Sequence, residues 1–175
     1  MNETLRVLKE RRSIRDFKPE LPPREQIDAV IEAGLYAPSG MGRQGAIVIA
    51  VTDPKIRARL AEENRKPTDW EEDFDPFYGA PVILSVLADR SVPTWVYDGS
   101  LMMGNMLNAA HSLGLGSIWI HRAAEVFESE AGKAILADLG IEGDYIGVGH
   151  CALGYIDGEY PETPERNPGR VFWVE

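Results

Sequence analysis

The sequence predicts an α+β fold in a single domain that spans residues 1–175. Short apolar runs typical of buried strands mix with longer segments of helical periodicity, without the strict alternation of a doubly wound sheet. Of the 175 residues, 44% are hydrophobic and 26% are charged. A chain of this size and composition can bury one sizeable core without the help of a disulfide or a metal.

Two helices are predicted before the first strand. The first runs from Asn2, a residue type that caps helices, to about Arg12. The second begins at Pro22 and Pro23, which suit a first helical turn, and ends before Pro38. Both show apolar residues at helical spacing, so each has one face that can pack on a core.

The remaining elements follow from apolar runs and the breaks between them. Strands are predicted at 46–52, 80–88, 116–120 and 145–155, and helices at 54–65, 94–113 and 124–139. The helix over 94–113 is apolar nearly all round, which in a small protein hints at a subunit interface. The apolar segment VFWV at 171–174 predicts a last strand that must pair somewhere.

Charge and composition exclude several classes of function. The formal net charge is -10 and the isoelectric point is near 4.8, which argues against general binding of nucleic acid. No apolar run is long enough to span a bilayer, and the charged N-terminal residues do not predict a signal peptide. The one cysteine, Cys151, lies in an apolar run and predicts a buried thiol in a protein of the reducing cytoplasm.

The positive charge of this acidic chain gathers in the segment ERRSIRDF at 10–17. Arg11, Arg12 and Arg15 fall within five positions beside Ser13, and arginine forks with a hydroxyl are suited to phosphate oxygens. The alternatives are cations that stabilise a helix C-terminus, or arginines paired with nearby carboxylates on a solvated face. Spacing alone favours these alternatives.

A second pair of arginines shifts the balance towards an anion site. Arg166 and Arg170 lie in PERNPGR, where neither a helix nor a core explains them. The phosphate-loop pattern and the dinucleotide glycine fingerprint are both absent, because GMGRQG at 40–45 follows a helix rather than a strand. An anion would therefore be held by side chains from distant parts of the chain.

Four segments together resemble the FMN-dependent nitroreductase family. They are RRSIRDF, AGLYAPSG, NMLNAAHSLGLGSIWI and PERNPGRVFWVE, in the order and at the spacing of the family. The resemblance implies a central mixed β-sheet flanked by helices and an intertwined homodimer with two FMN sites at its interface. It also implies that the apolar helix over 94–113 packs at the dimer core and that the strand at 171–174 pairs on the partner.

The resemblance assigns the arginines to the cofactor. Arg11, Arg12 and Ser13 would hold the phosphate and ribityl chain of FMN, and Arg166 would close on the phosphate from the tail. Arg15 would reach the pyrimidine end of the flavin, where a cation stabilises negative charge on the reduced ring.

Two further segments would contact the flavin ring. The loop after the second helix would cover it from the other subunit, through Pro38, Ser39, Gly40, Met41 and the family's retained Gln44. In SIWIHR, Trp119 and Ile120 would lie along the flavin, a backbone N–H near His121 would point at N5, and Arg122 would complete the segment.

Departures from the family pattern concern the substrate side. Gly42, Gly45 and Ala46 are smaller than the usual residues, so the pocket could be wider. The segment EEDFDPFYGA at 71–80 lacks the Asn and Lys that some members place at the flavin edge. The aromatic residues of 69–79 could form a small lid, although a solvated acidic loop is favoured.

The implied activity is transfer of a hydride from NADH or NADPH through FMN to nitroaromatic, quinone or similar acceptors, in a ping-pong cycle. No side chain is needed as a nucleophile, and only His121 could donate a proton beside the flavin. No metal-ligand spacing is present. The alternatives are a specialised reaction on the same fold (dehalogenation, flavin breakdown or ring dehydrogenation), a flavin-binding protein without turnover, and an acidic interaction module whose arginines only cap a helix.

Overall fold

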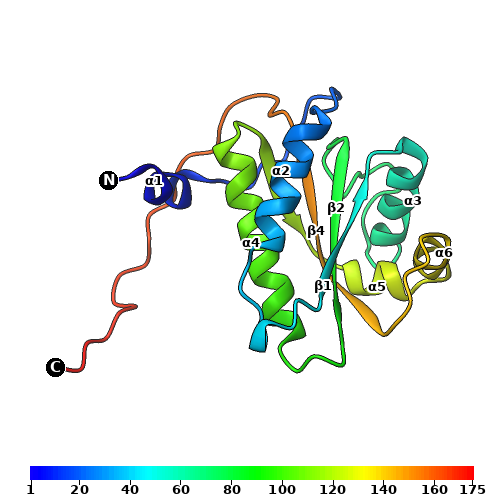
Figure 1. Cartoon of the computed structure of the whole chain (residues 1–175). Helices are drawn as coiled ribbons and strands as arrows, with labels where there is room; N and C mark the ends of the chain where they lie inside the picture. Colours follow the sequence, from blue (N-terminus) through cyan, green and yellow to red (C-terminus); the bar gives the residue numbers. More distant parts are fainter.

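A computed structural model describes residues 1–175 and confirms the α+β fold, with helices on both faces of a four-stranded sheet (Figure 1). The elements are α1 (Glu3–Glu10), α2 (Arg24–Leu35), a 3₁₀ turn (Gly40–Gly42), β1 (Ala46–Val51), α3 (Pro54–Arg65), β2 (Val82–Asp89), α4 (Trp95–Ser112), β3 (Gly116–Ile120), α5 (Ala123–Glu128), α6 (Glu130–Asp138) and β4 (Tyr145–Gly154).

The sheet has the strand order β1-β2-β4-β3, and each neighbouring pair is antiparallel. The parallel part of the predicted mixed sheet is confined to one bridge, between Ser13 and Ser117. β2 and β4 are the inner strands, and the first seven residues of β2 are all buried. β1 is an edge strand, so one row of its backbone N–H and C=O groups has no partner in the sheet.

Side chains that alternate along β2 contribute to two hydrophobic cores, one on each face of the sheet. Val82, Leu84 and Val86 pack with the methionines of α4 on the face that α2 and α4 cover. Ile83 and Leu87 point to the opposite face, towards α3, α5 and α6 (Figure 1). Successive side chains of a strand point to opposite faces, so this run of apolar residues is required for a sheet covered on both sides.

The predicted helix over 124–139 is two helices, α5 and α6, which join at Ser129. The backbone of Ser129 is extended, and its Oγ accepts a hydrogen bond of 3.1 Å from Gly132 N–H at the start of α6. A Cβ on Gly132 would lie 2.1 Å from the carbonyl oxygen of Val126, so only glycine permits this close turn. Serine as an N-cap within an apolar pattern marks the break.

The first helix is shorter than predicted, and the predicted last strand has no partner within the single chain. α1 ends at Glu10, two residues before the predicted end, and the backbone at Arg11 is extended. Residues 171–174 form no strand within the chain and are exposed, and the tail passes α1 and then runs away from the sheet (Figure 1). No helix has both the length and the apolar character needed to cross a membrane.

Candidate functional site

The arginine segment lies against the start of β3. Ser13 bridges to Ser117, and the N–H of Ile14 donates to the carbonyl oxygen of Ser117 at 3.1 Å. Ile14 is buried in the core, whereas Ser13 is half-buried and Arg15 is exposed. The buried isoleucine therefore fixes the segment, and its polar neighbours point away from the core.

The structure brings five of the predicted residues together around a cavity of about 340 Å³ that no hydrophobic residue lines. Its lining residues are Arg11, Arg12, Ser13, Arg15, Pro161, Glu162, Pro164 and Arg166. We call it the arginine pocket. Four guanidinium groups around one small cavity, with a single carboxylate, make a site suited to an anion.

Tyr160 fastens the tail beside this pocket. Its hydroxyl accepts a hydrogen bond from the N–H of Arg12 at 2.8 Å and donates to the carbonyl oxygen of Glu10 at 3.0 Å. The same oxygen lies 3.3 Å from Nδ1 of His111 on α4. These contacts hold the chain at the point from which Arg166 approaches the cluster.

Several guanidinium nitrogens of the pocket lack an acceptor. Arg12 is 9% exposed, and its Nη1 donates to the carbonyl oxygens of Lys9 and Arg11, at 2.9 and 2.5 Å. Nε and Nη2 of Arg12 and Nη1 of Arg11 are buried with no partner. Buried donors without acceptors are costly, so these atoms point to an anion that would satisfy them.

The two alternative explanations of the arginine cluster, helix capping and pairing with carboxylates, account for only part of it. Nη1 of Arg12 does bind carbonyls at the end of α1, as expected of a cation at a helix C-terminus. No ion pair links the arginines of the pocket to a carboxylate, and Glu10 pairs with Arg6 instead, at 2.6 Å. Capping thus accounts for one nitrogen of Arg12 and leaves the rest of the cluster unexplained.

The loop between α2 and β1 is held by α4. Gly40 N–H donates to Oδ1 of the buried Asp98 at 2.9 Å, and the hydroxyl of Thr94 donates to Oδ2 of Asp98 at 3.0 Å. Met41 and Gln44 have positive φ, 55° and 51°, which non-glycine residues adopt only when their surroundings impose it.

Within one chain, this loop does not reach the arginine pocket. Pro38, Ser39 and Gln44 line a separate cavity of about 160 Å³ together with Asp98. Gly40 and Met41 line another hollow, against 92–94, and Met41 is 89% exposed. The loop residues and the arginine pocket therefore lie in separate places on one chain.

The third predicted segment follows β3. Trp119 is half-buried against Gly149, and the side chain of Ile120 lies in the core at 7% exposure, so only the backbone of Ile120 is available to a ligand. His121 is exposed, and Arg122 has a left-handed φ of 70°. Neither backbone N–H of His121 or Arg122 donates to another group in the chain.

Sequence reasoning missed three residues of these sites: Asp98, Tyr160 and Asn64, whose Nδ2 donates to the carbonyl oxygen of His121 at 2.8 Å. Asp98 is a charged residue within the most apolar helix, and this mismatch is a signal that could have marked it. Asn64 lies among charged residues of α3 and carries no comparable signal.

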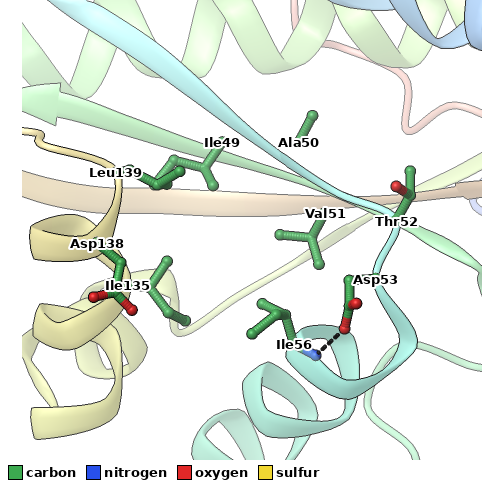
Figure 2. A pocket seen from close by; sticks show the side chains of 9 residues that line it. All are labelled: Ile49, Ala50, Val51, Thr52, Asp53, Ile56, Ile135, Asp138 and Leu139. Atoms are coloured by element: carbon green, nitrogen blue, oxygen red, sulfur yellow. Dashed lines mark hydrogen bonds between the residues drawn. The ribbon is translucent and has the colours of Figure 1, made fainter.

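A further hollow, the edge groove, has a volume of about 270 Å³ and lies beside β1, α3 and α6 (Figure 2). It is lined by Ile49, Ala50, Val51, Thr52, Asp53, Ile56, Ile135, Asp138 and Leu139. Asp53 caps α3 there by accepting from the N–H of Ile56 at 3.0 Å, as Figure 2 shows. None of the residues predicted to bind the cofactor line the edge groove.

The buried titratable residues offer no additional chemistry. Nδ1 of His150 lies 2.7 Å from the hydroxyl of Ser85, and burial lowers the pKa of His150 to about 3. Burial also raises the pKa of the Cys151 thiol to about 12. Both residues are therefore neutral at ordinary pH and are structural parts of β4.

The chain resembles known proteins both in sequence and in fold. The model of the nitroreductase family matches residues 8–155. The structure of a nitroreductase with bound FMN from Bacteroides fragilis superposes with a TM-score of 0.92, covers 100% of both chains and is 28% identical.

Curated relatives agree with this assignment. An NADPH-flavin oxidoreductase from Vibrio harveyi is 32% identical over 98% of this chain and 72% of its own length. An iodotyrosine deiodinase from Thermotoga neapolitana is 31% identical over 64% of this chain and 70% of its own length. The chain spans only 60% and 53% of two other curated relatives that it matches. Because the family model covers most of its length, the chain belongs to the nitroreductase family.

Proposed function

We propose that the chain is an FMN-dependent NAD(P)H oxidoreductase that reduces small electron-poor acceptors such as nitroaromatic compounds or quinones. The observation that carries the proposal is the arginine pocket, where buried guanidinium nitrogens lack acceptors and Arg166 joins the N-terminal cluster. Family membership and an FMN-bound structural neighbour support FMN as the ligand.

The residues present fit this cofactor. Arg11, Arg12, Ser13 and Arg166 would bind its phosphate, since their free donors surround a polar cavity. Arg15 would face the pyrimidine end and stabilise negative charge there. When bound, FMN supplies the acceptance and release of a hydride. The free N–H groups of the turn after β3 would orient its reacting edge.

The proposed enzyme works as a homodimer. The loop at 38–44 is separate from the arginine pocket in one chain, which is expected if it covers the flavin of the partner. Tyr97 and Leu101 on α4 are 68% and 47% exposed, although α4 is otherwise apolar. A second subunit would bury these side chains and complete each site. NADH or NADPH and the acceptor would then use the same open flavin face in turn.

The exposed tail of each subunit would pair on the free edge of β1 in the partner. The edge groove beside that strand offers apolar side chains from α3 and α6, shown in Figure 2. Val171, Phe172, Trp173 and Val174 are each more than 70% exposed in the single chain. Strand addition would satisfy the backbone groups of β1 and bury these four side chains. The buried free thiol of Cys151 agrees with a location in the reducing cytoplasm.

A second candidate is reductive dehalogenation, favoured by the iodotyrosine deiodinase relative. In that reaction a carbon–halogen bond would break and a carbon–hydrogen bond would form: the reduced cofactor would supply two electrons, solvent a proton, and halide would leave. Release of iodide from an iodotyrosine at a rate above that of nitroaromatic reduction would select this candidate.

The test is the visible spectrum of the purified protein, before and after addition of NADH, and separately NADPH, without oxygen. We expect flavin absorption that one of the two nucleotides bleaches, and that a quinone then restores. Flavin that neither nucleotide bleaches would indicate a binding protein without turnover. A colourless protein that takes up no added FMN would overturn the proposal.

A further inference from the structure

The turn that follows β3 is held in place by a residue of α3. Asn64 is fully buried, and its Nδ2 donates to the carbonyl oxygen of His121 at 2.8 Å. In return, Nε of Arg122 donates to the backbone carbonyl oxygen of Asn64 at 3.1 Å. The end of α3 and the turn are thus joined in both directions.

These two hydrogen bonds hold Arg122 in a backbone conformation that is unfavourable for this residue type. Arg122 has a φ of 70°, a left-handed conformation that is unfavourable for a residue other than glycine. Its guanidinium also stacks on the Trp70 ring, 4.2 Å from the ring centre. The charge of Arg122 is therefore directed at α3 and the segment after it, and only its backbone is free.

The bond from Asn64 sets the direction of one peptide group. In a planar trans peptide, the C=O of His121 and the N–H of Arg122 point in opposite directions. Because Asn64 binds the carbonyl oxygen on the α3 side, the Arg122 N–H is directed away from α3. That N–H donates to no group of the chain, so it is available to a ligand.

We propose that Asn64 is a positioning residue, which fixes the 121–122 peptide so that the Arg122 N–H is presented to the reacting edge of the flavin. The proposal rests on the proposed function, because it needs FMN in the site. Asn64 touches neither cofactor nor substrate in this account and acts only through the peptide that it holds.

The main variant is Asn64→Leu, which keeps the number and branching of the side-chain heavy atoms and removes the donor. Asn64→Asp is the second variant, because it keeps the shape and the acceptor that faces Arg122 but cannot donate to the His121 carbonyl. Asn105→Leu is the matched control, since Asn105 Nδ2 donates to the carbonyl oxygen of Ala33 at 3.0 Å, between α2 and α4. It loses the same kind of bond at a place remote from the turn.

The readout is hydrogen exchange of the Arg122 amide, measured by NMR with and without FMN. In the wild type and in Asn105→Leu, we expect FMN to slow this exchange at least tenfold. In both Asn64 variants, FMN should still bind through the arginine pocket but slow the exchange less than threefold. The rate of flavin reduction at saturating NADH should fall at least tenfold, with little change in FMN affinity.

The outcomes separate the inference from the function on which it rests. Asn64 variants that bind FMN with wild-type protection and a wild-type reduction rate would overturn the role of Asn64 and leave the proposed function intact. A wild-type protein that binds no FMN would overturn the proposed function itself. If Asn64→Leu does not fold, Asn64→Asp carries the same comparison.

Discussion

Two neighbouring arginines have different roles in the structure. Arg12 is buried and holds the carbonyl oxygens of Lys9 and Arg11, so it stabilises the end of α1 as well as lining the pocket. The Arg11 side chain makes no hydrogen bond within the chain, and its Nη1 is buried without a partner. Removing Arg11 should therefore report on ligand binding with little effect on folding.

We predict that the double variant Arg11→Ala/Arg166→Ala binds FMN about 100-fold more weakly. Hydrogen bonds to charged groups contribute about 1.5–3 kcal/mol each, and we take the lower value because Arg166 is exposed; about 1.4 kcal/mol corresponds to a tenfold change in Kd. Quenching of flavin fluorescence, titrated with apoprotein, measures the affinity. Arg24→Ala is the control, since Arg24 is an exposed arginine paired only with Asp28. Equal FMN affinities of the wild type, the double variant and the control would contradict binding of the FMN phosphate in the arginine pocket.

The buried His150 predicts how stability depends on pH. Burial lowers its pKa from 6.5 in the unfolded chain to about 3 in the folded protein, so the unfolded state takes up a proton first as the pH falls. The contribution of His150 to stability is complete above pH 6.5 and is lost as the pH falls towards 3, by at most about 1.4 kcal/mol per pH unit.

Urea unfolding at pH 7 and pH 5 measures this loss. In His150→Gln, which can keep a hydrogen bond to Ser85 but does not titrate, the difference in free energy of unfolding between the two pH values should be smaller than in the wild type. Carboxylates with lowered pKa, such as Asp75, contribute equally to both proteins and cancel in the comparison. An unchanged difference would contradict the assignment.

The positions of most helices and strands could be predicted because local residues decide them. Asn2 caps α1 through the N–H of Leu5, and Asp53 with Pro54 starts α3. The apolar run of β2 requires cover on both faces, and the structure provides it. These signals depend only on neighbours in the sequence.

Features that depend on distant partners could not be predicted in the same way. The bond from Asn64 to the His121 carbonyl oxygen and that from the Arg12 N–H to the Tyr160 hydroxyl join residues far apart in the chain. The neighbouring sequence of these residues does not indicate their partners. The arginine segment itself could be predicted because its charge contrasts with an acidic chain. Its closure by Arg166 was implied by the resemblance to the family rather than by neighbouring residues, because it depends on a fold that returns the tail to α1.

The whole molecule leaves apolar surface that one chain cannot cover. Tyr36 is 80% exposed and Tyr97 is 68% exposed, on the side of α2 and α4. Phe172 and Trp173 are 88% and 82% exposed in the tail. Large exposed apolar residues mark interaction surfaces, and the homodimer that we propose would cover both sets.

We predict that Phe172→Ser/Trp173→Ser weakens the dimer at least 100-fold. Full burial of each aromatic side chain is worth about 1.5–3 kcal/mol, and a dimer contains four of them. The variant therefore loses roughly 6–12 kcal/mol of burial, more than the roughly 2.8 kcal/mol that corresponds to a 100-fold change in Kd. Sedimentation velocity over a range of concentrations measures the monomer–dimer equilibrium. Leu21→Ser is the control, because Leu21 is 50% exposed and lies in no proposed contact. If the loop at 38–44 covers the partner's flavin, the variant that no longer dimerises should also bind FMN more weakly. A monomer that keeps full FMN affinity would contradict a shared site.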